Sequence, residues 1–237
     1  MKGLTSTQLS NLSSTALGDL GSTQIGGLTA TQVNDLGSTA IGTLTATQVG
    51  GLSAAQVGGL NATNLSALLE GGQTLNATQI GGLTATQLKG LSTTDFGDLN
   101  DTQIDGLTAT QIGALSTTNF GSLDTTAVTA LSQTQLKGIS TTQVGSLSYA
   151  GLQEFSSTQV GELSTAQIGA FSTTVIGALT TTDIGNIQAN QIPGFTTTQI
   201  AQLSASNISA MSATQLNAFT ATQVQAMNST QISAYLG

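Results

Sequence analysis

LTATQVGG, residues 44–51, is the octapeptide that is repeated along this chain. Numbered from its leucine as positions 1 to 8, the unit starts at Leu4 and recurs to Tyr235, interrupted once by the seven-residue unit LLEGGQT at residues 68–74. Position 1 is apolar in all 30 units, and position 6 is Leu, Ile, Val or Phe in 28 of the 29 complete ones. This pattern predicts a repeat architecture with a core built from two positions per unit.

The octapeptide favours a short helix followed by a tight corner. Position 2 is Ser, Thr, Asn, Asp or Gly in 27 of 29 units and position 5 is Gln in 18, which is the spacing of a capping box. Positions 1 and 6 then occupy the two ends of a hydrophobic staple. Gly is the commonest residue at position 7, as at Gly26, Gly50 and Gly58, where we expect a left-handed residue to end the helix. One long helix is excluded, because an eight-residue repeat would spread the apolar positions around its surface.

A β-solenoid is the alternative fold, with LTATQV as a strand and Gly-Gly as the corner. Thr, Val and Ile favour strands, and stacked Thr and Gln side chains form ladders in such folds. Positions 1 and 6 differ by five residues, however, so they would point to opposite faces of one strand. The predicted fold class is therefore an all-α solenoid of short helical turns, with the β-solenoid kept as the alternative.

The residues that replace Gln at position 5 have a period of their own. Counted in units, with the seven-residue unit included, the replacements are separated by 3, 3 and 1 units, and this series repeats. A pattern that closes every seven units predicts about 3.5 octapeptides per coil, by the same geometry that relates heptads to supercoils. Duplication of a 56-residue block without structural meaning would give the same series. About 3 to 3.5 units per coil give about 8 to 10 coils and a rod of roughly 80–100 Å at ~10 Å per layer.

The unbroken repeat predicts one domain over residues 1–237, without a linker. The irregular unit at residues 68–74 lacks an apolar residue at its second core position and contains Glu70, Gly71 and Gly72. We expect an exposed and mobile break in the coil there, without loss of the superhelix.

Composition excludes several classes of function. Only 6% of the residues are charged, the net charge is −8, and the three basic residues are Lys2, Lys89 and Lys137, so a nucleic-acid partner is not expected. Cys and His are absent, which removes the usual metal ligands and general bases. No apolar run approaches the ~20 residues of a membrane helix, so no membrane insertion is expected. We predict a protein that is not an enzyme and holds no cofactor or metal.

Two surface features are candidate binding sites. The acidic cluster of Asp95, Asp98, Asp101 and Asp105 has the oxygen ligands that calcium prefers but no known calcium-loop spacing, so we interpret it as a solvated face. Position 4 is Thr in 23 of the 28 regular units. Thr31, Thr47 and Thr63 represent this set, which could form a hydroxyl and methyl surface for glycan or ice; the alternative is that each Thr bonds only within its own helix.

Units such as ISTTQVGS (139–146) and FTATQVQA (219–226) resemble the L-S/T-x-x-Q-I/V-x-A octapeptide stretches of very large secreted proteobacterial adhesin-like proteins. The resemblance spans the whole chain and implies an extracellular spacer or fibre segment, and it carries no catalytic residues. Repeats that continue into both terminal coils predict head-to-tail self-association. The expected function is an extracellular structural segment, with an ice- or glycan-binding module as the alternative.

Overall fold

The computed structural model describes residues 3–97 and 99–237 of the chain, and all regular elements in this part are helical. It divides into two compact units, Met1–Ser122 and Leu123–Gly237, which are described separately. Each octapeptide forms one short helix and one corner. The all-α solenoid prediction is confirmed, and the β-solenoid alternative is wrong because the described residues contain no strand.

The first unit contains fourteen helices among its described residues. They are α1 (Ser6–Ser10), α2 (Ser14–Gly18), α3 (Ser22–Gly26), α4 (Ala30–Asp35), α5 (Ser38–Ile41), α6 (Ala46–Gly50), α7 (Ala54–Gly58), α8 (Ala62–Glu70), α9 (Ala77–Gly81), α10 (Ala85–Gly90), α11 (Thr93–Gly97), α12 (Asp101–Asp105), α13 (Ala109–Ala114) and α14 (Thr117–Gly121).

The second unit continues the same pattern and includes one 3₁₀ helix, η1, which contains Pro193. Its elements are α15 (Thr125–Ala130), α16 (Gln133–Gly138), α17 (Thr141–Ser146), α18 (Tyr149–Gln153), α19 (Ser157–Glu162), α20 (Thr165–Ile168), α21 (Thr173–Ala178), α22 (Thr181–Asn186), η1 (Ala189–Gly194), α23 (Thr197–Ile200), α24 (Ala205–Ser209), α25 (Ala213–Leu216), α26 (Ala221–Gln225) and α27 (Ser229–Leu236).

The helices begin directly after the position-2 residue, which is the N-cap, as the capping-box spacing predicts. At α6 the N-cap Thr45 is extended, with φ −75° and ψ 159°, and its hydroxyl accepts the backbone N–H of Gln48 at 3.4 Å. The side-chain carbonyl of Gln48 in turn accepts the backbone N–H of Thr45 at 2.9 Å. Leu44 before the cap and Val49 after the Gln are buried. The box and the staple therefore fix where the helix starts and which two side chains enter the core.

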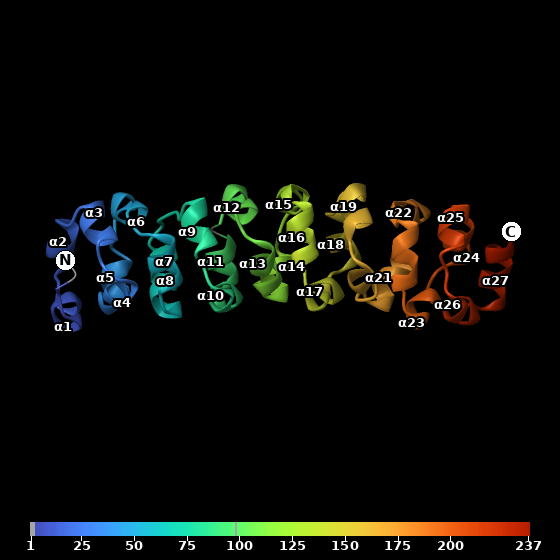
Figure 1. The fold of residues 1–237 in the computed structure, drawn as a ribbon, viewed down its shortest axis with the longest axis horizontal. Coiled ribbons are helices and arrows are strands. Elements are labelled where there is room, and N and C mark those ends of the chain that lie inside the picture. Colours follow the sequence, from blue (N-terminus) through green and yellow to red (C-terminus); the bar gives the residue numbers. More distant parts are fainter. Residues whose placement is uncertain (1–2, 98) are drawn as a thin grey trace. The chain divides into compact units, whose positions relative to one another are not determined.

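Helices three positions apart in the chain stack on one another (Figure 1). In the first unit α5, α8, α11 and α14 contact one another in series, as do α1, α4 and α7. In the second unit α16, α19 and α22 form such a series, and α18 contacts α21. Positions 1 and 6 of successive helices lie between the stacks, so the core is a continuous column of Leu, Ile, Val and Phe within each unit.

Glycine has a different role at the corner from the one we expected. Among the described residues only Gly37, Gly72 and Gly237 have positive φ, so the prediction that position-7 glycines are left-handed is wrong. Several glycines instead lie where two coils approach closely. A Cβ on Gly58 would lie 2.2 Å from the carbonyl oxygen of Gly82, which is in the coil that stacks on it. Gly is therefore required at this position for coil-to-coil packing and not for a left-handed cap.

The irregular unit at residues 68–74 is a helix extension and a turn. Helix α8 is nine residues long and continues through Leu68 and Leu69, which are buried, so these two residues do not fit the expected exposed break. Gly72 then turns the chain with φ 72°. Gln79, beyond the irregular unit, still bonds to the preceding coil, at the carbonyls of Leu52 and Val49. The irregular unit, which is one residue shorter than the others, therefore changes the backbone only locally, and the coils beyond it still stack.

Candidate functional site

The most extensive polar arrangement in the chain joins each coil to the one before it. The side-chain nitrogen of Gln48 donates to the carbonyl oxygens of Leu17 at 2.7 Å and Leu20 at 2.9 Å, which are 31 and 28 residues earlier. Gln199 in the second unit makes the same pair of bonds to Ile168 and Phe171, at 3.0 and 2.8 Å. Each such Gln side chain therefore serves both the cap of its own helix and the corner of the preceding coil.

This amide ladder, as we call the set of coil-to-coil Gln bonds, runs through both units. The Gln residues that bond two corner carbonyls include Gln48, Gln56, Gln79, Gln87, Gln111, Gln159, Gln167, Gln191, Gln199, Gln215, Gln223 and Gln231. All of them are buried. The usual offset of 28 residues equals 3.5 octapeptides, 28/8, in agreement with the predicted number of units per coil.

Residues that replace Gln at position 5 weaken or remove the ladder bond. Asn119 and Asn207, whose side chains are one methylene shorter, each bond a single corner carbonyl, that of Leu91 and that of Leu179, both at 3.0 Å. Ala and Val at this position have no donor at all. Sequence reasoning recognised the replacements as a periodic mark but missed their cause, because the carbonyl partners lie about one coil away in the chain.

The three Thr residues singled out from the sequence are all exposed. They lie on helices of different stacks: Thr31 on α4, which contacts α1 and α7; Thr47 on α6, which contacts α3; and Thr63 on α8, which contacts α5 and α11. The structure does not bring these three side chains into one row. Thr63 does share a stack with Thr39 on α5, Thr94 on α11 and Thr118 on α14, and these three are exposed as well.

The Asp residues of the acidic cluster differ in solvent exposure. The Asp95 carboxylate is buried and accepts the hydroxyls of Ser92 at 2.9 Å and Ser66 at 3.3 Å. Asp101 and Asp105 lie exposed on α12, and Asp98 lies outside the described residues. No grouping of three or more metal-binding side chains occurs in residues 3–97 and 99–237.

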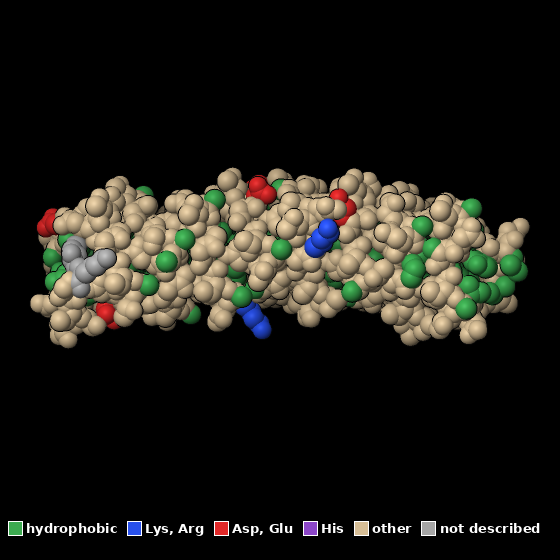
Figure 2. Space-filling model, in the orientation of Figure 1, with side chains coloured by type: hydrophobic (Ala, Val, Ile, Leu, Met, Phe, Trp, Pro, Cys, Tyr) green, Lys and Arg blue, Asp and Glu red, His purple; other side chains and the backbone are tan. Residues whose placement is uncertain are grey.

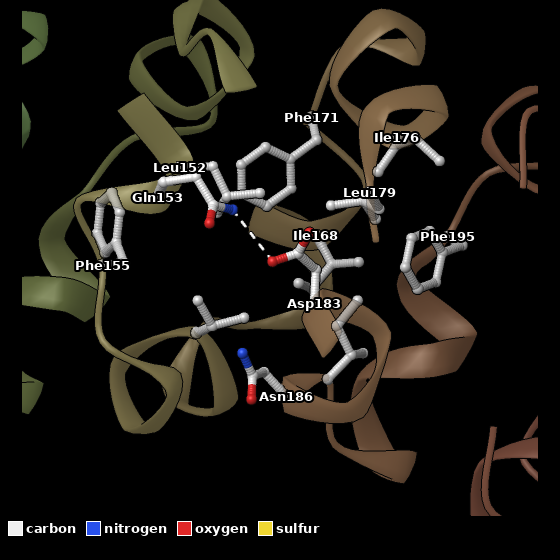
Figure 3. A pocket seen from close by; sticks show the side chains of 12 residues that line it. Leu152, Gln153, Phe155, Ile168, Phe171, Ile176, Leu179, Asp183, Asn186 and Phe195 are labelled. Atoms are coloured by element: carbon white, nitrogen blue, oxygen red, sulfur yellow. Dashed lines mark hydrogen bonds between the residues drawn. The ribbon is translucent and has the colours of Figure 1, made fainter. Parts of the chain in front are cut away.

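A second polar cluster lies beside a cavity in the second unit. The carboxylate of Asp183 on α22 accepts the hydroxyl of Tyr149 at 2.8 Å and the side-chain N–H of Gln153 at 3.1 Å, both from α18. Thr180 adds its backbone N–H at 2.7 Å and its hydroxyl at 2.8 Å. Figure 3 places the Gln153 to Asp183 bond at the centre of a cavity rimmed by Phe155, Phe171 and Phe195.

These bonds shift the ionisation of both acidic groups. The Asp183 bond, followed by burial, raises the pKa of Tyr149 above its ordinary value. For Asp183, burial is the largest single influence and opposes ionisation, but the combined hydrogen bonds from Thr180, Gln153 and Tyr149 lower its pKa below the ordinary value. At neutral pH Asp183 is therefore a carboxylate and Tyr149 a neutral phenol.

The surface is dominated by uncharged polar groups. Figure 2 shows one face, on which acidic and basic side chains are few; hydrophobic side chains form isolated spots over most of it and gather near the C-terminal end, at the right. None of the helices in the described part of the chain has the length and apolar character needed to cross a membrane.

Comparison with known proteins identifies one related family. Residues 149–181, which include α18 to α21, match the family model described as the ALTTAQ repeat. No curated protein and no solved structure gives a significant match to the chain. Over this segment the chain is similar to a recognised repeat family, in agreement with the repeat architecture seen in both units.

Proposed function

We propose that this chain is an extracellular structural repeat segment, a spacer or fibre-forming part of an adhesin-like protein, without enzymatic activity. The amide ladder is the observation that carries the proposal. In many of the units the buried position-5 side chain is an amide that bonds the preceding coil, as Gln48 and Gln199 do. A chain built in this way specifies the length and stiffness of a scaffold.

The proposal predicts that length scales with the number of octapeptides. We would insert a second copy of residues 123–178, which comprise seven octapeptides, directly after residue 178. The insertion equals two offsets of 28 residues, so it preserves the ladder register. The expected result is a rod about 20 Å longer than the parent, at ~10 Å per layer, measured by electron microscopy and small-angle X-ray scattering. Compact particles whose longest dimension does not change would contradict a spacer role.

We also propose head-to-tail association between copies. Gln8 and Gln24 are exposed, and in the described residues their side chains take part only in the caps of their own helices. Their side-chain N–H groups can donate to corner carbonyls of a second copy, as the other ladder Gln residues donate to the preceding coil. Sedimentation velocity should reveal concentration-dependent assembly that weakens in a Gln8→Ala, Gln24→Ala double variant. A strictly monomeric parent at high concentration would refute this association.

A second candidate function is binding of ice or glycan through position-4 Thr. The favouring observation is that Thr39, Thr63, Thr94 and Thr118 are exposed on four stacked helices. Replacing these four residues by Tyr should abolish thermal hysteresis or retention on a glycan column. A matched variant with Tyr at Thr31 and Thr47, which lie on other stacks, should retain most of the activity. An unmodified chain without hysteresis or glycan retention would exclude this function.

A further inference from the structure

The corner between α18 and α19 lacks the amide that the ladder supplies elsewhere. Asp183 occupies position 5 of its octapeptide, and the carbonyls 28 and 31 residues earlier belong to Phe155 and Leu152. At the comparable corner two octapeptides later, Gln199 donates to Phe171 and Ile168. A carboxylate has no N–H to donate. Within the described part of the chain no side-chain donor reaches the carbonyl oxygen of Leu152 or of Phe155.

The same corner borders an apolar cavity. Its lining includes Leu152, Phe155, Phe171 and Phe195, all buried, together with Asp183. The cavity volume is about 60 Å³. A cavity of about 150 Å³ holds benzene, and a water molecule takes about 30 Å³ in the liquid, so this cavity fits a short unbranched chain and not a ring.

The carboxylate at the cavity carries an unbalanced negative charge. The side-chain groups that act on Asp183 are those of Thr180, Gln153 and Tyr149, none of which is a cation. Its Oδ2 atom accepts three hydrogen bonds, one from the Tyr149 hydroxyl and two from the backbone N–H and hydroxyl of Thr180. Its Oδ1 atom accepts only the side-chain N–H of Gln153. Oδ1 thus has remaining acceptor capacity on the side of Gln153, where Figure 3 shows the cavity.

We propose that this cavity binds a small primary alkylammonium ion. The ammonium group donates to Asp183 Oδ1 and to the carbonyl oxygens of Phe155 and Leu152, in place of the missing Gln amide. A primary ammonium has three donors and no acceptor, and each of these three oxygens has a lone pair left for a further donor. Oδ1 accepts one N–H, from Gln153, and the Leu152 carbonyl accepts the backbone N–H of Phe155. Its alkyl chain enters the apolar cavity, whose lining includes Phe155, Phe171 and Phe195.

The test uses n-butylammonium as the probe, titrated into the full ¹⁵N-labelled chain and followed by amide chemical shifts. We expect saturable shifts at Leu152, Phe155 and Asp183, no such shifts with butyrate, and at least tenfold weaker binding of 1-butanol. Nα-acetyl-lysine N-methylamide forms a second arm. Binding of n-butylammonium alone assigns the site to free amines, and binding of both extends it to lysine side chains; either result supports the site.

Three variants separate the proposed contacts from general effects. Asp183→Gln restores the ladder residue, so it should raise Tm and abolish binding. Asp183→Asn keeps the size of the side chain but removes its charge, and should bind at least tenfold more weakly. Glu162→Gln removes the same charge from a residue that does not line the cavity, and should bind like the parent. Equal binding of 1-butanol, unchanged binding by Asp183→Gln, or no shifts with n-butylammonium would overturn the proposal.

Discussion

The position-5 Gln has two structural roles in a single side chain. Its carbonyl oxygen caps its own helix, and its nitrogen bonds two carbonyls of the preceding coil. Gln suits this position because an amide has both a donor and an acceptor at one end of a flexible stem. Glu would lose the donor, and Asn is too short to bond both carbonyls, as Asn119 and Asn207 show.

Gln48→Ala should destabilise the chain by about 2–4 kcal/mol, because it leaves the carbonyls of Leu17 and Leu20 buried without their side-chain donor. Urea unfolding followed by circular dichroism measures this loss. Gln24→Ala is the matched control, because Gln24 is exposed and serves only the cap of its own helix. The control should cost less than about 1 kcal/mol. Equal losses in the two variants would mean that the coil-to-coil bonds add nothing to stability.

The bond between Tyr149 and Asp183 predicts a pH dependence with two limbs. The pKa of Asp183 is lowered in the folded state, so its contribution is present above its unfolded pKa of about 3.9 and is lost as pH falls through the folded pKa. The pKa of Tyr149 is raised, so its contribution is present below its unfolded pKa of about 10 and is lost as pH rises through the folded pKa. Melting curves across this range should show that Tyr149→Phe flattens the alkaline limb. An alkaline limb identical to that of the parent would contradict this assignment.

At the scale of the element, the helices are too short to be stable alone. Most span four to six residues, whereas isolated helices below about 12–15 residues are marginal in water. Most are held by an N-cap or capping box, by the burial of positions 1 and 6, and by the helix three positions away. Some corner glycines, such as Gly26 and Gly58, permit that last contact, because the backbones meet there with no space for a side chain.

Gly58→Ala should therefore destabilise the first unit by about 1–3 kcal/mol, since the new Cβ would lie 2.2 Å from the Gly82 carbonyl oxygen and the coils would have to move apart. Gly50→Ala is the control at the same repeat position. A Cβ there meets nothing within 4 Å and φ is negative, so Ala should be neutral or stabilise by up to about 1 kcal/mol. Thermal and urea unfolding of both variants measure the difference. Similar effects of the two substitutions would argue against close coil packing as the reason for Gly58.

At the scale of the whole molecule, stability rests on apolar burial and neutral hydrogen bonds. Only 6% of residues are charged. Surface ion pairs contribute little and are screened by salt, so raising NaCl from 0.05 to 0.5 M should change Tm by less than about 3 °C. Ammonium sulfate at equal ionic strength should raise Tm more, because sulfate strengthens apolar burial. A large fall in Tm with NaCl would reveal an electrostatic contribution that this charge content does not predict.

Local spacing was sufficient to predict the helical units and the core. Thr45, Gln48 and the flanking Leu44 and Val49 identify a capping box and a staple from six consecutive residues, so these contacts are encoded locally. The 3, 3, 1 series of replacements also predicted 3.5 octapeptides per coil. The offset agrees with it: the position-5 side chain of Gln48 bonds the position-1 carbonyl of Leu20, 28 residues or 3.5 octapeptides earlier. The Asp183 cavity was missed, since its lining extends over more than forty residues from Leu152 to Phe195.

The sequence by itself determined what depends on neighbours within eight residues: the helical class, the capped starts, the two core positions and the low-charge surface. Only the tertiary structure decided what depends on residues about one coil apart. Gln48 bonding to Leu17 and Leu20, Gly58 against Gly82, and the pairing of Asp183 with Tyr149 all join residues at least 24 positions apart. The physical reason is that the residues around a corner carbonyl or a corner glycine do not show which residue will contact it. That contact forms only when the neighbouring coil stacks on the corner.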